Sequence, residues 1–257
     1  MQPSDFLKFS LILMLSAFIY RFRNIVNTKK YNFLYVLITI IPITITFIQK
    51  DLGAIAVLSV IAMSLYVFNP NTSMKKVLII ITSFLVIVFL YGLFNSYIIT
   101  RIKDYYSGNS YQTNQALIAV SKGGIFGAGP FQGVQKFNYL PEPQGDSIFG
   151  TFAEEFGFIW TSLFLIVYFV FLIRSLYLVR YFKDEFRIML IVGIVTHFIA
   201  QIILNIGSII KIIPLSGDVL PLFSQGGTSL IVNILEIAII LSLTMNNTRD
   251  YREEIIP

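Results

Sequence analysis

Seven long apolar runs divide the chain, and they constrain its fold more than any other feature. A transmembrane helix needs about 20 predominantly apolar residues, and each run approaches that length between polar segments. One soluble core could not enclose so many of them. We therefore predict an all-α, polytopic membrane helix bundle that forms a single membrane domain over residues 1–257, with spans at Phe6–Tyr20, Phe33–Ile48, Leu52–Phe68, Val77–Ile99, Ile148–Ile173, Ile188–Ile210 and Thr228–Leu243.

The composition supports a membrane protein and removes several kinds of site. Hydrophobic residues make up 56% of the chain and charged residues only 13%, whereas soluble domains carry about a quarter charged residues. The chain has no cysteine and one histidine. This excludes a disulfide framework and a thiolate metal site, and it disfavours a histidine-based metal site or a Ser/His/Asp triad.

The basic residues predict which segments face the cytoplasm. Twelve of the 19 lysines and arginines fall in alternate connecting segments, within residues 21–30, 75–76, 174–187 and 249–252. Cytoplasmic loops of membrane proteins carry such an excess. We therefore predict a multi-pass protein of the bacterial cytoplasmic (inner) membrane with a cytoplasmic C-terminus, an extracytoplasmic loop at residues 100–147, and no nucleic-acid partner for the net charge of +5.

Two short polar segments lie at the outer ends of spans. The first is Gln2-Pro3-Ser4-Asp5, followed by Lys8; its local explanation is a helix start, with Ser4 as N-cap and an Asp5–Lys8 pair at i,i+3. The second, residues 49–53, reads Gln-Lys-Asp-Leu-Gly. Its local explanation is an interfacial turn between two spans.

The long outer loop is rich in glycine and amide side chains, and an ordered loop of this length is more often functional than not. Asp146 ends the loop just before a predicted span, where an N-cap also belongs. Glu154 and Glu155 follow about two helical turns later, ~12 Å along the axis. Carboxylates at that depth are costly unless they are paired or face a wet cavity.

Read in order, these segments resemble those of the SEDS family (shape, elongation, division and sporulation), represented by FtsW, RodA and SpoVE. The resemblance covers essentially the whole chain. The family carries Gln-Pro-Ser-Glu…Lys, Gln-Pro-Asp-Leu-Gly, Tyr-Gln…Gln, Gly-Gly…Gly-x-Gly, Leu-Pro-Glu…Asp-x-Ile-Phe…Glu-Glu-x-Gly and Pro-x-Thr-Gly…Ser-Tyr-Gly-Gly-Ser motifs. Their counterparts here are residues 2–8, 49–53, 111–115, 123–129, 140–157 and 214–229.

This chain also departs from the family pattern. Asp5 replaces glutamate, Lys50 replaces proline, Gln225 replaces tyrosine, and Asp218 is an unusual charge. The family has ten spans, so the resemblance predicts a truncated reading frame or fragment that lacks the first three. The Leu-Pro-Glu-Pro-Gln-Gly-Asp variant favours a division-type FtsW protein over an elongation-type one.

The resemblance implies a peptidoglycan glycosyltransferase that polymerises lipid II on the outer face of the membrane, for cell division or cell shape. It implies that Asp146 is the catalytic base. A divalent cation, Mg or Mn, near Asp51, Asp146 or Glu142 would help to neutralise the diphosphate. Further implied partners are membrane lipid, a class B penicillin-binding transpeptidase and divisome or elongasome proteins. The predicted substrate-binding residues are Asp5, Lys8, Asp51, Lys136, Glu142, Gln112 and Gln115, with Arg101 and Lys50 as further diphosphate ligands.

Other functions and two buried-looking residues remain open at this point. A lipid II flippase or a non-catalytic membrane scaffold of the cell-wall machinery would use the same polar residues without a base, and a secondary transporter would need internal repeats that the chain lacks. We predict that His197 is a packed core residue. Glu236, inside the last span, requires a partner lysine or a water-lined groove.

Overall fold

The computed structural model describes residues 2–26, 28–69, 72, 96–107, 110–214 and 216–255, and within them the secondary structure is helical without a strand, as predicted. Most of the predicted span Val77–Ile99 lies outside these residues. The chain packs as two compact units, which are described separately. Unit 1 comprises Met1–Leu78, Val170–Ala200 and Gly227–Pro257, and unit 2 comprises Ile79–Phe169 and Gln201–Gly226.

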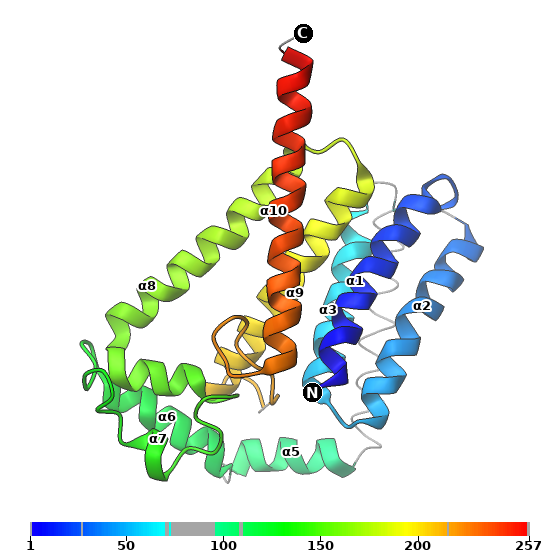
Figure 1. The fold of residues 1–257 in the computed structure, drawn as a ribbon. Helices are drawn as coiled ribbons and strands as arrows, with labels where there is room; N and C mark the ends of the chain where they lie inside the picture. Colours follow the sequence, from blue (N-terminus) through cyan, green and yellow to red (C-terminus); the bar gives the residue numbers. More distant parts are fainter. Residues whose placement is uncertain are drawn as a thin grey trace. The chain divides into compact units, whose positions relative to one another are not determined.

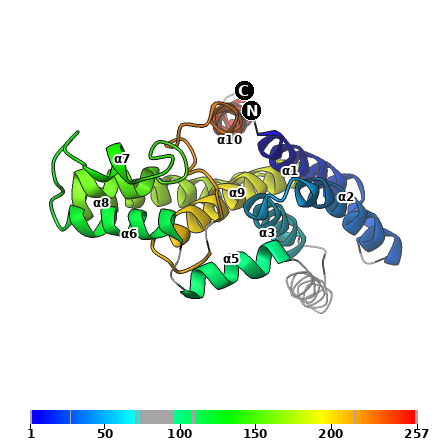
Figure 2. The ribbon, with the colours of Figure 1, turned by 90° about the horizontal axis from the view of Figure 1, so that it is seen from below.

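Unit 1 contains four helices whose sequence signals are local. They are α1 (Pro3–Arg21), α2 (Lys29–Ile48), α3 (Leu52–Phe68) and α10 (Gly227–Ile255). The first three pack pairwise against one another, and α1 also contacts α10 (Figure 1, Figure 2). Apolar side chains at three- and four-residue spacing line these contacts, among them Leu11, Leu15, Leu58, Ile61 and Leu65.

Two helix starts in unit 1 differ in how well the sequence predicts them. Thr28 caps α2, since its Oγ1 accepts a hydrogen bond from the Tyr31 N–H at 3.2 Å. The prediction of Ser4 as a cap is wrong, because α1 already begins at Pro3, with Gln2 at the N-cap. Proline favours the first helical position because the N–H that it lacks would have no partner there.

Five helices among the described residues are long and apolar enough to cross a membrane: Pro3–Arg21, Lys29–Ile48, Ile148–Tyr181, Glu185–Ile209 and Gly227–Met245. Their burial differs. Only 17% of the apolar window is buried in the helices that begin at Lys29 and Ile148, against 72% in the helix that begins at Glu185. The helices that begin at Lys29 and Ile148 therefore keep most of their apolar side chains on the outer surface, where they can contact lipid.

Unit 2 contains helices in the stretch that the sequence suggests is a loop. These are α5 (Ser96–Ser107), α6 (Tyr111–Gly123) and the single turn α7 (Gln135–Asn138). Two longer helices contribute residues to both units, α8 (Ile148–Leu178) and α9 (Glu185–Ile209). Short 3₁₀ turns at Arg23–Ile25 and Val179–Tyr181 complete the described elements.

The helix α8 is broken at Gly157, where the sequence predicts one continuous span. Gly157 has φ 73° and ψ −176°, a conformation that only glycine adopts readily. At the break the chain meets the glycine-rich segment: a Cβ on Gly157 would lie 2.2 Å from the Gly127 nitrogen, and one on Gly123 would lie 2.0 Å from the Ala153 oxygen. The glycines therefore allow two stretches of backbone to touch.

Candidate active site

Asp146 lies two residues before the first residue of α8. The helix begins at Ile148, so Ser147 rather than Asp146 occupies the N-cap position. The Ser147 hydroxyl donates to the Pro141 carbonyl at 3.1 Å and so closes the preceding turn. Asp146 itself is half-buried. Asp146 therefore lies in the turn that precedes the helix, outside the N-cap position.

The backbone around Asp146 is held by Asn205, a polar residue inside the apolar helix α9. The Asn205 side-chain amide donates to the Asp146 carbonyl at 2.9 Å and to the Asp218 carbonyl at 2.7 Å. Asn205 is buried, at 1% exposure. One amide therefore joins the turn before α8 to the segment that follows α9.

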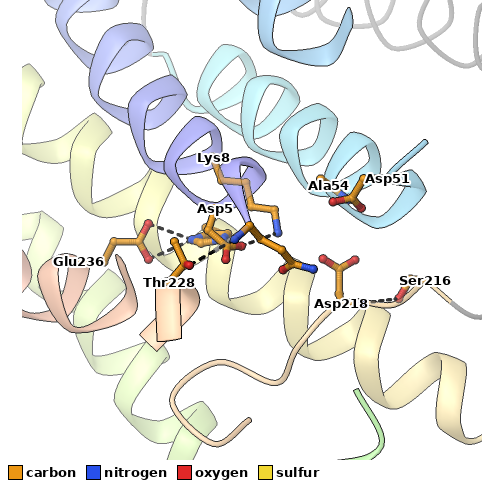
Figure 3. A network of polar contacts seen from close by, with 10 residues as sticks. Asp5, Lys8, Asp51, Ala54, Ser216, Asp218, Thr228 and Glu236 are labelled. Carbon is orange, nitrogen blue, oxygen red and sulfur yellow. Dashed lines mark hydrogen bonds and ion pairs between the residues drawn. The ribbon is translucent and has the colours of Figure 1, made fainter. Parts of the chain in front are cut away.

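That second segment makes further contacts with the same turn. The Ser224 hydroxyl donates to the Gly145 carbonyl at 3.0 Å, and the Gln225 N–H donates to the Gln144 carbonyl at 2.7 Å. The segment is itself folded by a 3.4 Å hydrogen bond from the Asp218 N–H to the Ser216 hydroxyl (Figure 3). Sequence reasoning named residues 214–229, which include Ser224, as a motif but missed Asn205, whose only signal is a polar side chain in an apolar helix.

Three predicted substrate residues lie in the same unit as Asp146. Glu142 is exposed and has a φ of 47°, and its carbonyl accepts the Gly145 N–H at 3.0 Å. The Gln112 side chain, on α6, donates to the Ser147 hydroxyl at 3.4 Å. Gln115 lies one turn further along the same helix and is half-buried. Gln112 is therefore tied to the residue that follows Asp146.

Lys136, the fourth such residue in this unit, is engaged by α8. Its ammonium pairs with the Glu155 carboxylate, which also accepts the Phe131 N–H at 3.1 Å. Glu154 accepts the N–H groups of Val134 and Gln135 at 3.0 and 3.2 Å. Both carboxylates are thus paired, as their depth demands, and they hold the loop that carries Lys136.

Unit 1 holds the other three predicted substrate residues, Asp5, Lys8 and Asp51. The Lys8 ammonium lies 3.3 Å from the Asp5 carboxylate, and both side chains are 3% exposed (Figure 3). The predicted i,i+3 pair is therefore present and buried. Asp51 caps α3, since its carboxylate accepts the Ala54 N–H at 2.9 Å (Figure 3). The residue before it, Lys50, has a φ of 58° and is exposed.

Unit 1 also contains a buried pair that sequence reasoning did not join. Nδ1 of His197 on α9 lies 2.9 Å from both carboxylate oxygens of Glu236 on α10. Both side chains are at most 1% exposed. The prediction that His197 is buried is correct, and the partner required by Glu236 is this histidine rather than a lysine.

The predicted divalent cation finds few protein ligands in the part of the chain that the structure covers. No three His, Cys, Asp or Glu side chains converge among those residues. A cation at Asp51, Asp146 or Glu142 would therefore take most of its oxygen ligands from a substrate diphosphate or from water, as Mg²⁺ commonly does.

Comparison with known proteins places this arrangement in a family. The model of the FtsW, RodA and SpoVE family, described as "Cell cycle protein", matches residues 1–249. The probable peptidoglycan glycosyltransferase FtsW of Buchnera aphidicola subsp. Schizaphis graminum is 35% identical over 252 residues, which cover 94% of this chain and 71% of that protein. Stage V sporulation protein E of Bacillus subtilis is 32% identical over 254 residues, which cover 95% and 68%.

Solved structures share the fold. A chain from a peptidoglycan synthase complex, studied for the structural coordination of polymerization and crosslinking, superposes with a TM-score of 0.76 at 22% identity, covering 96% of this chain and 70% of that one. The rod shape determining protein RodA of Thermus thermophilus superposes with a TM-score of 0.66 at 20% identity, covering 96% and 66%. The family model and the relatives above 30% identity together show that this chain belongs to the FtsW/RodA/SpoVE family of cell cycle proteins.

Proposed function

We propose that the chain is a peptidoglycan glycosyltransferase that polymerises lipid II, with Asp146 as the base. The observation that carries this proposal is the support of the Asp146 turn. Its backbone is fixed through Asn205, Ser224 and Gln225, while the Asp146 side chain remains half-exposed. A base needs both a fixed position and access to the hydroxyl that it deprotonates.

The chemistry of glycosyl transfer from a lipid diphosphate suits one such carboxylate. The acceptor sugar hydroxyl attacks the anomeric carbon, the bond from that carbon to the diphosphate oxygen breaks, and the hydroxyl proton passes to Asp146. The lipid diphosphate leaves with the electron pair. It needs no general acid because it is already a good leaving group, in contrast to the leaving group of a glycosidase.

Cationic side chains would stabilise the departing diphosphate. Lys8 is the better candidate in unit 1, although it already pairs with Asp5, and Lys136 is the candidate in unit 2. An ammonium that is paired with a carboxylate can still donate to a phosphate oxygen, since it carries three N–H donors. Gln112 and Gln115 on α6 would supply amide contacts to the sugars.

The relatives indicate the cellular setting of this reaction. Their names include FtsW, a probable peptidoglycan glycosyltransferase, and one fold neighbour belongs to a synthase complex that couples polymerization to crosslinking. On this basis the chain acts in bacterial cell-wall synthesis, in the cytoplasmic membrane, together with a class B penicillin-binding transpeptidase. The sequence variant before Asp146 favours the divisome over the elongasome.

The test of the base is Asp146→Asn. Asparagine keeps the size of the side chain and the backbone carbonyl that Asn205 holds, but it cannot accept the proton. We expect polymer synthesis to fall about 10²–10⁴-fold with normal folding. The measurement is the length and amount of glycan formed from lipid II, resolved on a gel, with the protein reconstituted beside a class B transpeptidase.

A matched control is Asp184→Asn. Asp184 accepts the Phe186 N–H at 3.1 Å at the start of α9, and asparagine caps about as well as aspartate. We expect this variant to polymerise normally. Normal polymer from Asp146→Asn would instead reject the base and put the flippase or scaffold function first.

The predicted orientation requires its own test, since the site must face the lipid-linked sugar. The exposed positions Gln144 and Lys183 lie in segments predicted to be outside and inside. In intact cells, Gln144→Cys should react with an impermeant maleimide and Lys183→Cys should react only after lysis. The opposite labelling would place Asp146 on the cytoplasmic side and remove the proposed reaction.

A further inference from the structure

Five large apolar side chains stand outward from the loop between α6 and α8. We call them the loop surface: Ile125, Phe126, Phe131, Val134 and Phe137, which are 61%, 78%, 84%, 52% and 70% exposed. A loop in water would present polar side chains at most such positions. An apolar cluster of this kind marks contact with another phase or another molecule.

Two polar side chains of the same loop, Gln135 and Lys136, are withdrawn from this surface. Residues 123–139 contain a single charged side chain, Lys136, and it pairs with Glu155, a carboxylate that is 10% exposed. Gln135 is 3% exposed, and its N–H donates to Glu154. The one charge of the loop and the side chain of Gln135 are thus withdrawn from the surface, whereas the aromatic rings and Gln132 are exposed.

The loop surface continues a surface that must face lipid. The Phe158 N–H donates to the Gly124 carbonyl at 2.9 Å and the Ile159 N–H donates to the Ile125 carbonyl at 3.2 Å. The loop backbone therefore lies directly against the start of the apolar part of α8. On that part the side chains of Phe158, Trp160 and Ile166 are 71%, 56% and 58% exposed.

The residue types fit the boundary between headgroups and acyl chains. Tryptophan and tyrosine are enriched at that level of a bilayer, and segments that lie in the interface bury phenylalanine and leucine side chains there. The Lys136 ammonium lies 4.8 Å from the centre of the Phe137 ring and 5.4 Å from that of Phe131. This cation–π contact and the ion pair with Glu155 let the one charge of the loop stay near lipid without water.

We propose that residues 124–137 are seated in the bilayer, with the loop surface in contact with lipid at the end of the α8 span. The partner is the lipid itself. The chain continues from this segment through Leu140 to the Asp146 turn, so the seating sets the depth at which that turn meets a membrane-anchored molecule. The seating does not depend on the reaction proposed above.

Nitroxide labels can test the seating, because the chain has no cysteine of its own. Single variants Phe126→Cys, Phe131→Cys and Phe137→Cys are labelled in the full chain and reconstituted in bilayers of phosphatidylethanolamine and phosphatidylglycerol. Two references are Ile166→Cys, on the outward face of α8, and Gln144→Cys, in the polar turn. The collision rate of each label with oxygen, which concentrates in lipid, is compared with that of an aqueous nickel complex.

We expect the three loop labels to resemble Ile166→Cys, with an oxygen-to-nickel ratio several-fold above that of Gln144→Cys. Ratios equal to that of Gln144→Cys would place the loop in water and overturn the proposal. Low collision rates with both reagents would mean that protein covers the surface, which also overturns it. The ratios do not depend on whether Asp146→Asn keeps its polymerase activity, so either proposal can fail without the other.

Discussion

In unit 1, buried acidic side chains face basic side chains, whereas at the start of α8 in unit 2 they mainly face backbone N–H groups. Asp5 pairs with Lys8 within one helix, and Glu236 pairs with His197 between two helices. Glu154 instead accepts two N–H groups of the loop. The first arrangement joins side chains of helices that hold their own backbone, and the second fixes a loop whose own hydrogen bonds form only short turns and the single turn α7.

The two kinds of carboxylate differ in what the protein loses when one is removed. A side-chain pair inside a helix bundle can be replaced by two apolar residues with little loss, because the helices hold their own backbone bonds. A carboxylate that satisfies backbone N–H groups cannot be replaced in this way, since the amides remain and need an acceptor. The loop that carries Lys136 therefore depends on Glu154 for its conformation.

The largest effect that we predict follows from separating the buried pair of unit 1. His197→Leu leaves Glu236 without a partner at full burial, so we expect a loss of about 3–5 kcal/mol in the free energy of unfolding. The double variant His197→Leu/Glu236→Leu should recover most of it. The measurement is the unfolding midpoint in mixed micelles. A double variant as unstable as the single one would contradict this account of the pair.

A smaller effect is predicted at Glu154. Glu154→Ala leaves the N–H groups of Val134 and Gln135 without their acceptor, which should cost about 1–3 kcal/mol. The amides of both residues should then exchange with solvent hydrogen much faster, while the amides of α1 to α3 do not. The matched variant Glu154→Gln keeps one acceptor oxygen and should fall between. Unchanged exchange in Glu154→Ala would show that the loop has other support.

The smallest effect on stability is predicted for Lys136→Met, at about 1 kcal/mol, because the Glu155 carboxylate keeps its hydrogen bond from the Phe131 N–H after the lysine is removed. The activity of this variant shows whether Lys136 binds the diphosphate or only supports the loop. If Lys136 also binds the diphosphate, polymer synthesis should fall at least tenfold more than in the control Lys122→Met, whose lysine is exposed on α6. Equal activity of the two variants would leave Lys136 as a purely structural residue.

The parts of the fold that the sequence predicts well are those set by neighbouring residues. Apolar runs predict where α1, α2 and α3 lie, and i,i+3 spacing predicts the Asp5–Lys8 pair. The break in α8 was not predicted, because the run on both sides of Gly157 is apolar and nothing local demands a kink. Its cause is the distant segment around Gly127, which only the folded chain brings to α8.

In the candidate site, too, the sequence predicts individual residues but not the contacts between distant segments. The resemblance to a family identified Asp146 and the motif at residues 214–229, but not the contacts that join them. Asn205 lies 59 residues from Asp146, and one amide in an apolar helix has many possible partners. The Glu236–His197 pair was missed for the same reason, because the two residues lie 39 positions apart and the sequence around one does not indicate the other.

The close approach of Gly127 and Gly157 affects how natural variation in this chain should be read. A side chain at either position would collide with backbone at about 2.2 Å, so a library selected for growth would retain glycine there as strictly as it retains a catalytic aspartate. Invariance alone would then suggest that the two glycines, like the aspartate, take part in catalysis. The abundance of the protein in the cell separates the two roles. Variants with a side chain at either glycine would misfold and be degraded, whereas variants that lack the catalytic base would accumulate to normal levels.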